Sequence, residues 1–348
     1  MLVSELKKLM KNYTREELGL LAVEMYKAIP KKIRDEKNVD IMVKDIHAFL
    51  AQNKAGREKK KAIDLSVLQY EINQFLSDAY NQYYFAPNQF VRKKERPKWR
   101  FKVKEYIKDL ESVPCQGKDA LAAADLLKKL YILLCDASVI YLFNTEDPFR
   151  SVGIEQPALA DLVISRILAQ GINNESLRQA IGLVIEDKHD RETLPSHLIL
   201  KLVGNLKTPQ AKSMAIEESK LLNSELRKAL QTSSSNNKKR SSSQTDVNHY
   251  LAINKINNLV ETVLRLAFAL YEYEEGIRYF RDNYLEQNKE IALYVLLELL
   301  FEYDLKDFWL KEYERALAQG IKPRKGLQSM AAYTREKNEL PDTLDYQF

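Results

Sequence analysis

The sequence predicts an all-α protein, built as an irregular array of many helices that is either helical-repeat (solenoid-like) or a bundle. Apolar residues recur at helical spacing through most of the 348 residues, so they fall on one face of successive helices. Leu, Lys, Glu and Ala are abundant, and these residues lose little side-chain freedom in a helix. No proline lies between Pro209 and Pro323, which favours long uninterrupted helices there.

The first helices are marked by apolar stripes and by a start signal. We expect one helix to end near Met10 and a second to follow Thr14, because Thr14 and Glu17 have the spacing of a capping box. Pro30 marks the end of that second helix. Further helices are expected at residues 39–50 and 63–84.

The stretch that begins at Trp99 fits two periods. Alternating aromatic and basic residues fit a strand, but the apolar residues from Trp99 to Leu110 also fit a helix over a longer distance. We therefore predict a helix. The next segment, Ala120–Phe143, is apolar on most faces, which indicates a buried central helix.

The remaining helices follow at regular intervals. Thr208 and Pro209 form a start signal, since a hydroxyl cap precedes a proline at the first helical position. An apolar helical pattern also runs from Val260 to Tyr271. The other helices are expected at residues 157–170, 174–186, 194–206, 209–230, 289–303, 306–319 and 327–338.

A Ser- and Asn-rich segment, residues 232–246, contains no apolar residue. Such a segment cannot bury enough surface to offset its ordering entropy, so we predict a disordered, flexible loop. We accordingly expect an N-terminal helical unit at 1–90 and a central unit at 91–231, which opens with a basic segment. The linker at 232–246 then leads to an acidic, Tyr-rich C-terminal unit at 247–348.

The chain lacks the signals of secretion and membrane insertion. Its N-terminus has no unbroken apolar run, and no stretch reaches the roughly 18 apolar residues that a membrane span needs. The two cysteines, Cys115 and Cys135, cannot form a disulfide framework. We therefore expect a soluble, cytoplasmic protein with no membrane partner.

Motifs of common enzyme classes are missing from the sequence. The ten glycines are scattered and form no phosphate-binding loop, and no Cys/His set has metal-ligand spacing. The sequence leaves enzyme activity open but favours its absence, and we predict no catalytic residue, no cofactor and no metal. The only candidates for a metal site are His189, Asp190 and His197, since imidazole and carboxylate suit ions that assist hydrolysis. A polar turn is the competing interpretation.

The strongest local charge lies in the segment Val91–Lys108, which has nine basic and two acidic residues. Aromatic residues alternate with the cations, and the two together could hold phosphates and stack on bases. The competing interpretation is a solvated helix whose aromatic residues face the core. The candidate nucleic-acid-binding residues are Arg92, Lys93, Lys94, Arg96, Lys98, Trp99, Arg100, Lys102 and Lys104.

The segment Tyr271–Glu314 has the opposite charge, with twelve acidic residues, five basic residues and seven tyrosines. Tyrosine is favoured at protein interfaces, because its ring buries area while its hydroxyl keeps a partner. This predicts a protein-binding surface, unless the segment pairs with the basic segment inside the same molecule. The candidate partner-binding residues are Tyr271, Tyr273, Tyr279 and Tyr284.

These patterns together predict a non-catalytic cytoplasmic helical scaffold that binds a protein partner, because stacked helices expose extended surfaces. A nucleic-acid-binding protein that uses residues 91–108 is the alternative. A metal-dependent hydrolase around His189 and Asp190 is the second alternative.

Overall fold

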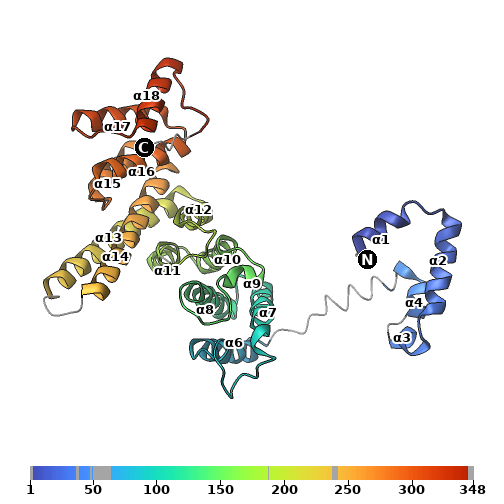
Figure 1. Cartoon of the computed structure of the whole chain (residues 1–348). Coiled ribbons are helices and arrows are strands. Elements are labelled where there is room, and N and C mark those ends of the chain that lie inside the picture. The colour runs from blue at the N-terminus through green and yellow to red at the C-terminus, as the bar shows by residue number, and fades with distance from the viewer. Residues whose placement is uncertain are drawn as a thin grey trace. The chain divides into compact units, whose positions relative to one another are not determined.

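The computed structural model describes residues 3–36, 39–47, 49, 64–186, 188–236 and 242–343. These residues form helices, turns and loops without any strand, which confirms the predicted all-α class (Figure 1). In the same residues, no helix is both long enough and apolar enough to cross a membrane. Contacts divide the chain into two compact units, Met1–Asp64 and Leu65–Phe348.

The first unit has the helices α1 (Val3–Met10), α2 (Arg15–Ala28), α3 (Lys31–Glu36) and α4 (Val39–Lys44). The predicted capping box is present at the start of α2. The Glu17 backbone N–H donates to Thr14 Oγ1 at 3.3 Å, and Glu17 Oε2 accepts from the Thr14 backbone N–H at 2.8 Å. A polar contact joins α2 to α4, since the Tyr26 hydroxyl donates to Asp40 Oδ1 at 2.7 Å.

The second unit begins with helices that enclose one central helix. They are α6 (Leu65–Tyr80), the short 3₁₀ turn η1 (Arg96–Lys98), α7 (Trp99–Ser112), α8 (Ala120–Val139), α9 (Pro148–Val152), α10 (Gln156–Leu168), α11 (Asn174–Ile185) and α12 (Pro195–Asn205). The prediction of a helix from Trp99 is confirmed. So is the buried central helix, because α8 packs against α6, α7, α9 and α10.

Two long helices, α13 (Pro209–Asn236) and α14 (Ser242–Phe268), follow and lie side by side (Figure 1). Both extend into the segment predicted as a loop, so residues 232–236 and 242–246 are helical, and only residues 237–241 lie outside the described residues. In the division by contacts, α13 and α14 both belong to the second unit. The reason is that α14 also packs against α11, α12 and α15, which ties both sides of the hairpin into one unit.

The C-terminal helices are α15 (Tyr273–Asn283), α16 (Lys289–Glu302), α17 (Lys306–Ala318) and α18 (Lys325–Lys337). They share an apolar core around Trp309 with the end of α14. The buried Arg265 guanidinium of α14 reaches α16, where it binds both carboxylate oxygens of the more exposed Glu302 at 2.8 and 2.7 Å. In the second unit, helices thus pack mainly against near neighbours in the sequence, as in helical-repeat arrays.

A close approach of α14 and α15 gives a test of this packing. A Cβ atom added at Gly276 would lie 2.9 Å from the Ala267 Cβ, whereas nothing lies within 4 Å of a Cβ added at Gly182 in α11. We expect Gly276→Ala to lower the free energy of unfolding by about 1–3 kcal/mol, because the helices must separate. The matched control Gly182→Ala should raise it by about 0.5–1 kcal/mol through helix propensity. Urea unfolding followed by far-UV circular dichroism measures both, and equal effects of the two changes would contradict the packing.

Candidate functional site

The helix α7 turns its apolar face inward and its charged face outward. The Trp99 ring is only 5% exposed and stacks on Phe143, with ring centroids 3.9 Å apart. Val103, Ile107 and Leu110 are buried on the same face. Trp99 therefore belongs to the core and does not present its ring to a ligand, although the sequence places it among the candidate binding residues.

The basic residues of the candidate site lie outside that core. Arg92 to Lys98 belong to the loop and 3₁₀ turn before α7, and Arg100, Lys102 and Lys104 lie on the exposed surface of α7 itself. Arg96 is half-buried, and the exposed members are Arg92, Lys93, Lys94, Lys98, Arg100, Lys102 and Lys104. Among the described residues, only Lys98 of these has a carboxylate partner within 4.0 Å, which is Glu95 at 3.1 Å. Lys102 lines a cavity together with the carboxylates Glu71, Asp78, Glu105 and Asp109, whereas Lys93 and Arg100 line one without any carboxylate. The positive charge is therefore least compensated around Lys93 and Arg100.

Two aromatic rings lie beside these cations, since Phe85 shares a cavity with Lys93 and Arg100 and the Arg100 guanidinium lies 5.0 Å from the Phe101 ring centre. Other exposed rings lie in loops, and most were not identified from the sequence. Phe101 is 60% exposed, Phe90 is 64% exposed and Tyr141 is 59% exposed. Phe90 stacks on Tyr83 at a centroid distance of 4.5 Å, and Phe85 stacks on Tyr141 at 5.6 Å. Apart from Phe101, the exposed rings come from loops, where no helical period marks an aromatic residue as inward or outward. Their only sequence signal is their position beside a basic segment.

Asn88 fixes the loop that carries these rings. Its Nδ2 donates to the backbone carbonyls of Tyr83 and Ala86, each at 2.7 Å, and its Oδ1 accepts from the backbone N–H groups of Phe90 and Val91. One side chain thus satisfies four backbone groups that would otherwise need water, so the loop is held in one conformation.

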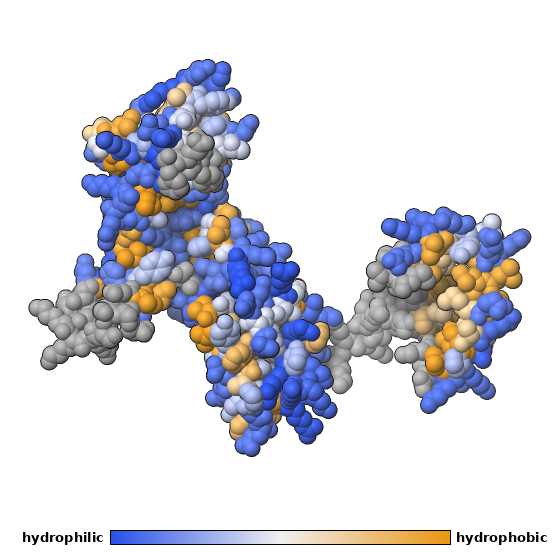
Figure 2. Space-filling model, in the orientation of Figure 1, coloured by the Kyte–Doolittle hydropathy of each residue, from blue (hydrophilic) through white to orange (hydrophobic). Residues whose placement is uncertain are grey.

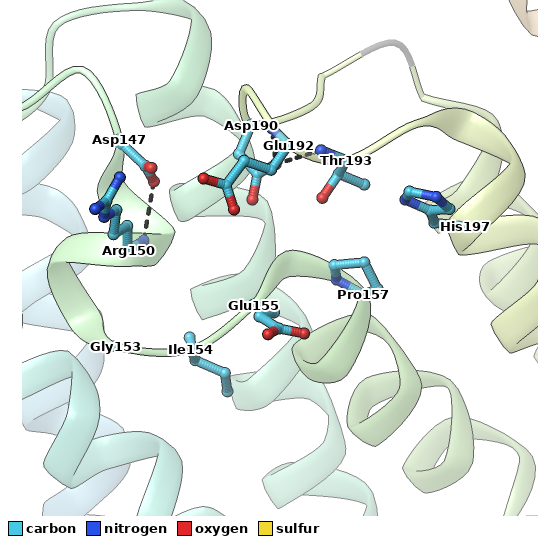
Figure 3. Close-up of a pocket in the computed structure, with 10 residues that line it drawn as sticks. All are labelled: Asp147, Arg150, Gly153, Ile154, Glu155, Pro157, Asp190, Glu192, Thr193 and His197. Atoms are coloured by element: carbon cyan, nitrogen blue, oxygen red, sulfur yellow. Dashed lines mark hydrogen bonds between the residues drawn. The ribbon is translucent and has the colours of Figure 1, made fainter.

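The histidine region forms a polar turn at the edge of a pocket of about 610 Å³ (Figure 3). Asp190 Oδ1 accepts from the backbone N–H groups of Glu192 at 3.0 Å and Thr193 at 2.8 Å. His197 Nδ1 accepts from the Leu194 backbone N–H at 3.3 Å, at the start of α12. These contacts are those of turn formation and helix capping.

The structure does not bring His189 together with His197. His189 lines a separate cavity of about 190 Å³, and Asp190 is the only residue of the three that borders both cavities. Within the described part of the chain, no three metal-ligating side chains converge on a point that could hold an ion. Asp187 lies outside that part.

Only one of the four candidate partner-binding tyrosines is fully presented to solvent. Tyr271 is 80% exposed. Tyr273 packs against Phe268 and Phe308, the Tyr279 hydroxyl accepts from Asn223 Nδ2 at 3.0 Å, and Tyr284 stacks on Phe280. These three tyrosines therefore serve the internal packing of the C-terminal helices.

The acidic residues of the C-terminal helices are partly neutralised by basic residues of the same region. Glu312 pairs with Arg281 at 2.6 Å, and Glu290 pairs with Arg324 at 2.8 Å. The Arg324 guanidinium lowers the pKa of the Glu290 carboxyl through a hydrogen bond. None of the ion pairs between described residues joins the acidic segment to the segment Val91–Lys108.

The first unit, taken by itself, exposes most of its apolar side chains (Figure 2). Of its described residues, Val39 is the only buried apolar one, and no residue of α2 is buried. Its exposed large apolar residues number eleven: Leu9, Met10, Tyr13, Leu20, Val23, Met25, Ile33, Ile41, Met42, Val43 and Ile46. In the second unit, large apolar side chains form a buried core, whereas most of those described in the first unit face solvent.

Cys135 is not an activated nucleophile. Burial raises the pKa of the Cys135 thiol to about 12, so that thiol stays protonated at neutral pH. Cys115 is exposed. Comparison of the chain with protein-family models, curated proteins and solved structures finds no match, so the functional assignment depends on these surfaces alone.

The inward and outward faces of α7 predict opposite responses to truncation. We expect Trp99→Ala to lower the free energy of unfolding by about 3–5 kcal/mol, because it removes the ring stacked on Phe143. The matched change Phe101→Ala, on the exposed face, should change that free energy by less than about 0.5 kcal/mol. Urea titration monitored by far-UV circular dichroism separates the two, and a neutral Trp99→Ala would show that the ring is not part of the core.

Proposed function

We propose that this protein is a non-catalytic helical scaffold that binds a protein partner through the exposed apolar side chains of α1, α2 and α4. The observation that supports this proposal most directly is the imbalance among the described residues of the first unit, where eleven large apolar side chains are exposed and only Val39 is fully buried. Soluble proteins rarely leave large contiguous apolar surface in water unless it is an interaction site.

The energetics of the first unit support the same proposal. Ordering a residue costs about 1–2 kcal/mol in backbone entropy, which a folded unit offsets mainly by burying apolar surface. None of the 14 residues of α2 is fully buried, and only Leu18, Leu21 and Tyr26 are half-buried. Contacts such as that of Tyr26 with Asp40 are exposed and contribute little. A covering partner would supply the missing burial.

The chemistry of the face indicates the kind of partner. Met10, Met25 and Met42 are all exposed there, and methionine adapts its shape to varied apolar surfaces. The remaining exposed residues are mainly aliphatic and lie on helices, so an amphipathic helix of a protein partner would complement them. We therefore propose an amphipathic helical segment as the occupant.

Hydrogen exchange of the full-length chain, alone and in complex with a purified candidate partner, tests this proposal. We expect backbone amides of α2 to exchange rapidly in the free chain and to be protected by about tenfold or more in the complex, because covered helices open less often. The double change Leu20→Glu and Val23→Glu should abolish that protection by placing charges in the apolar contact.

The matched control is Leu121→Glu with Val139→Glu, since both of these side chains are exposed and apolar but lie in α8 of the second unit. It should leave the complex intact. Protection of α2 in the dilute free chain would show that the chain covers its own apolar face. Protection that grows with chain concentration would show self-association. Either result contradicts the proposed partner.

A second candidate function is binding of single-stranded nucleic acid by the cationic surface that α7 forms with the loop before it, which includes Lys93, Lys94 and Arg100. The observation that favours it is the combination of unpaired cations with exposed rings at Phe90, Phe101 and Tyr141. Cations neutralise the phosphates, while aromatic rings stack on unpaired bases.

Retention of a single-stranded oligonucleotide across a salt series tests this second function. We expect affinity to fall steeply with salt, and the triple change Lys93→Glu, Lys94→Glu and Arg100→Glu to reduce the slope by about two or more. The control triple Lys118→Glu, Lys207→Glu and Lys322→Glu alters equally exposed lysines elsewhere in the second unit. Equal losses in both triples, or no retention at low salt, would exclude a dedicated surface on α7.

A further inference from the structure

We propose that a cleft beside the first turn of α7 binds the phosphate group of a nucleotide, either free or within a strand. This deepens the second candidate function and rests on it where the nucleotide is part of a strand. The cleft has a volume of about 460 Å³, and its walls include Lys93, Arg96 and Arg100. No carboxylate is among the residues that line it.

Arg96 is the fixed cation of this cleft. Its Nε donates to the Val91 carbonyl at 3.1 Å, and its Nη2 donates to the Asn88 carbonyl at 3.2 Å. The loop that accepts these bonds is itself held by the Asn88 side chain. The guanidinium is therefore oriented before any ligand arrives, which lowers the entropy lost on binding.

Lys93 and Arg100 are the available cations. Within the described residues, neither has a carboxylate within 4.0 Å. Glu95, which follows Lys93 in the sequence, pairs with Lys98, and Glu146, which follows the lining residue Thr145, pairs with Arg191. A phosphate that entered the cleft would thus meet cations that no internal anion already neutralises, and charge-assisted hydrogen bonds to phosphate are among the strongest.

The aromatic side of the cleft indicates a nucleotide rather than phosphate alone. Phe85 lines the cleft and stacks on Tyr141, with an interplanar angle of 19°. Trp99 also borders the cleft, and its stack on Phe143 makes that wall rigid. A partly exposed ring beside a phosphate site gives a base a surface on which to stack.

Two other cavities of similar size are lined mainly by acidic residues, so a basic lining is not a general feature of cavities in this protein. The pocket in Figure 3 is lined by Asp147, Glu155, Asp190 and Glu192 against a single arginine. A further cavity of about 470 Å³, between α6 and α7, is lined by four carboxylates and one lysine. Both would repel a phosphate, whereas the cleft at Lys93 and Arg100 attracts one.

Calorimetric titration of the full-length protein at low salt tests this inference. The probes are adenosine 5′-monophosphate, adenosine, inorganic phosphate and a short single strand of oligoadenylate. We expect the double change Lys93→Ala and Arg100→Ala to weaken binding of the monophosphate by about tenfold or more. The matched control Lys102→Ala with Lys108→Ala removes two exposed cations of α7 outside the cleft, and should weaken it by less than about twofold. Phe85→Leu should weaken the monophosphate but not inorganic phosphate.

The outcomes separate this inference from the nucleic-acid function. Monophosphate binding that depends on the cleft, without any strand binding, supports the inference and contradicts the second candidate function. If both double variants weaken binding of the oligoadenylate strand equally, the result supports the nucleic-acid function but overturns the assignment of a phosphate site to the cleft. Absence of monophosphate binding by the unaltered protein also overturns it. Equal affinity for phosphate and monophosphate, unchanged by Phe85→Leu, overturns the assignment of a nucleotide. Far-UV circular dichroism confirms that each variant is folded.

Discussion

The stack of Trp99 on Phe143 is the contact on which the cationic surface depends. It anchors the first turn of α7 to the loop after α8, so the apolar face of α7 meets the core and its lysines and arginines face solvent. The same contact sets one wall of the cleft that Lys93 and Arg100 share. The packing of Trp99 in the interior therefore determines where the nearby lysines and arginines lie on the surface.

The charges of the second unit are distributed unevenly. Around α15–α18, acidic side chains find arginines and lysines of the same helices, and the buried Arg265 has both Glu261 and Glu302 as partners. Around α7, cations outnumber the carboxylates that they can reach. Removing one partner of such a pair leaves the other charge buried without a counter-charge, which destabilises the fold. The pairs of Arg265, Glu312 and Arg324 therefore have a structural role. Lys93 and Arg100 have no carboxylate partner among the described residues, so they can bind a ligand without breaking an ion pair.

Much of the architecture is predictable from periodicity and capping signals. The capping box at Thr14 and the buried helix at Ala120–Val139 follow directly from residue type and spacing. The helical ends of the Ser- and Asn-rich segment could not be predicted in this way. Tertiary packing between α13 and α14 extends both helices into residues of weak helix propensity.

The candidate sites are less predictable, because spacing gives the face of a helix but not what covers that face. Trp99 and Tyr273 have the residue types of binding groups, yet they pack internally. Phe85 and Phe90 lie in a loop without any period, so their exposure emerges only from the fold. The sequence of α2 does not reveal that Leu20 and Val23 are exposed while Leu18 and Leu21 are only half-buried, because this depends on what packs against the helix. A further consequence concerns the thiols. Cys135 is a buried, protonated residue of α8, so the exposed Cys115 after α7 is a single natural attachment point for a spectroscopic label.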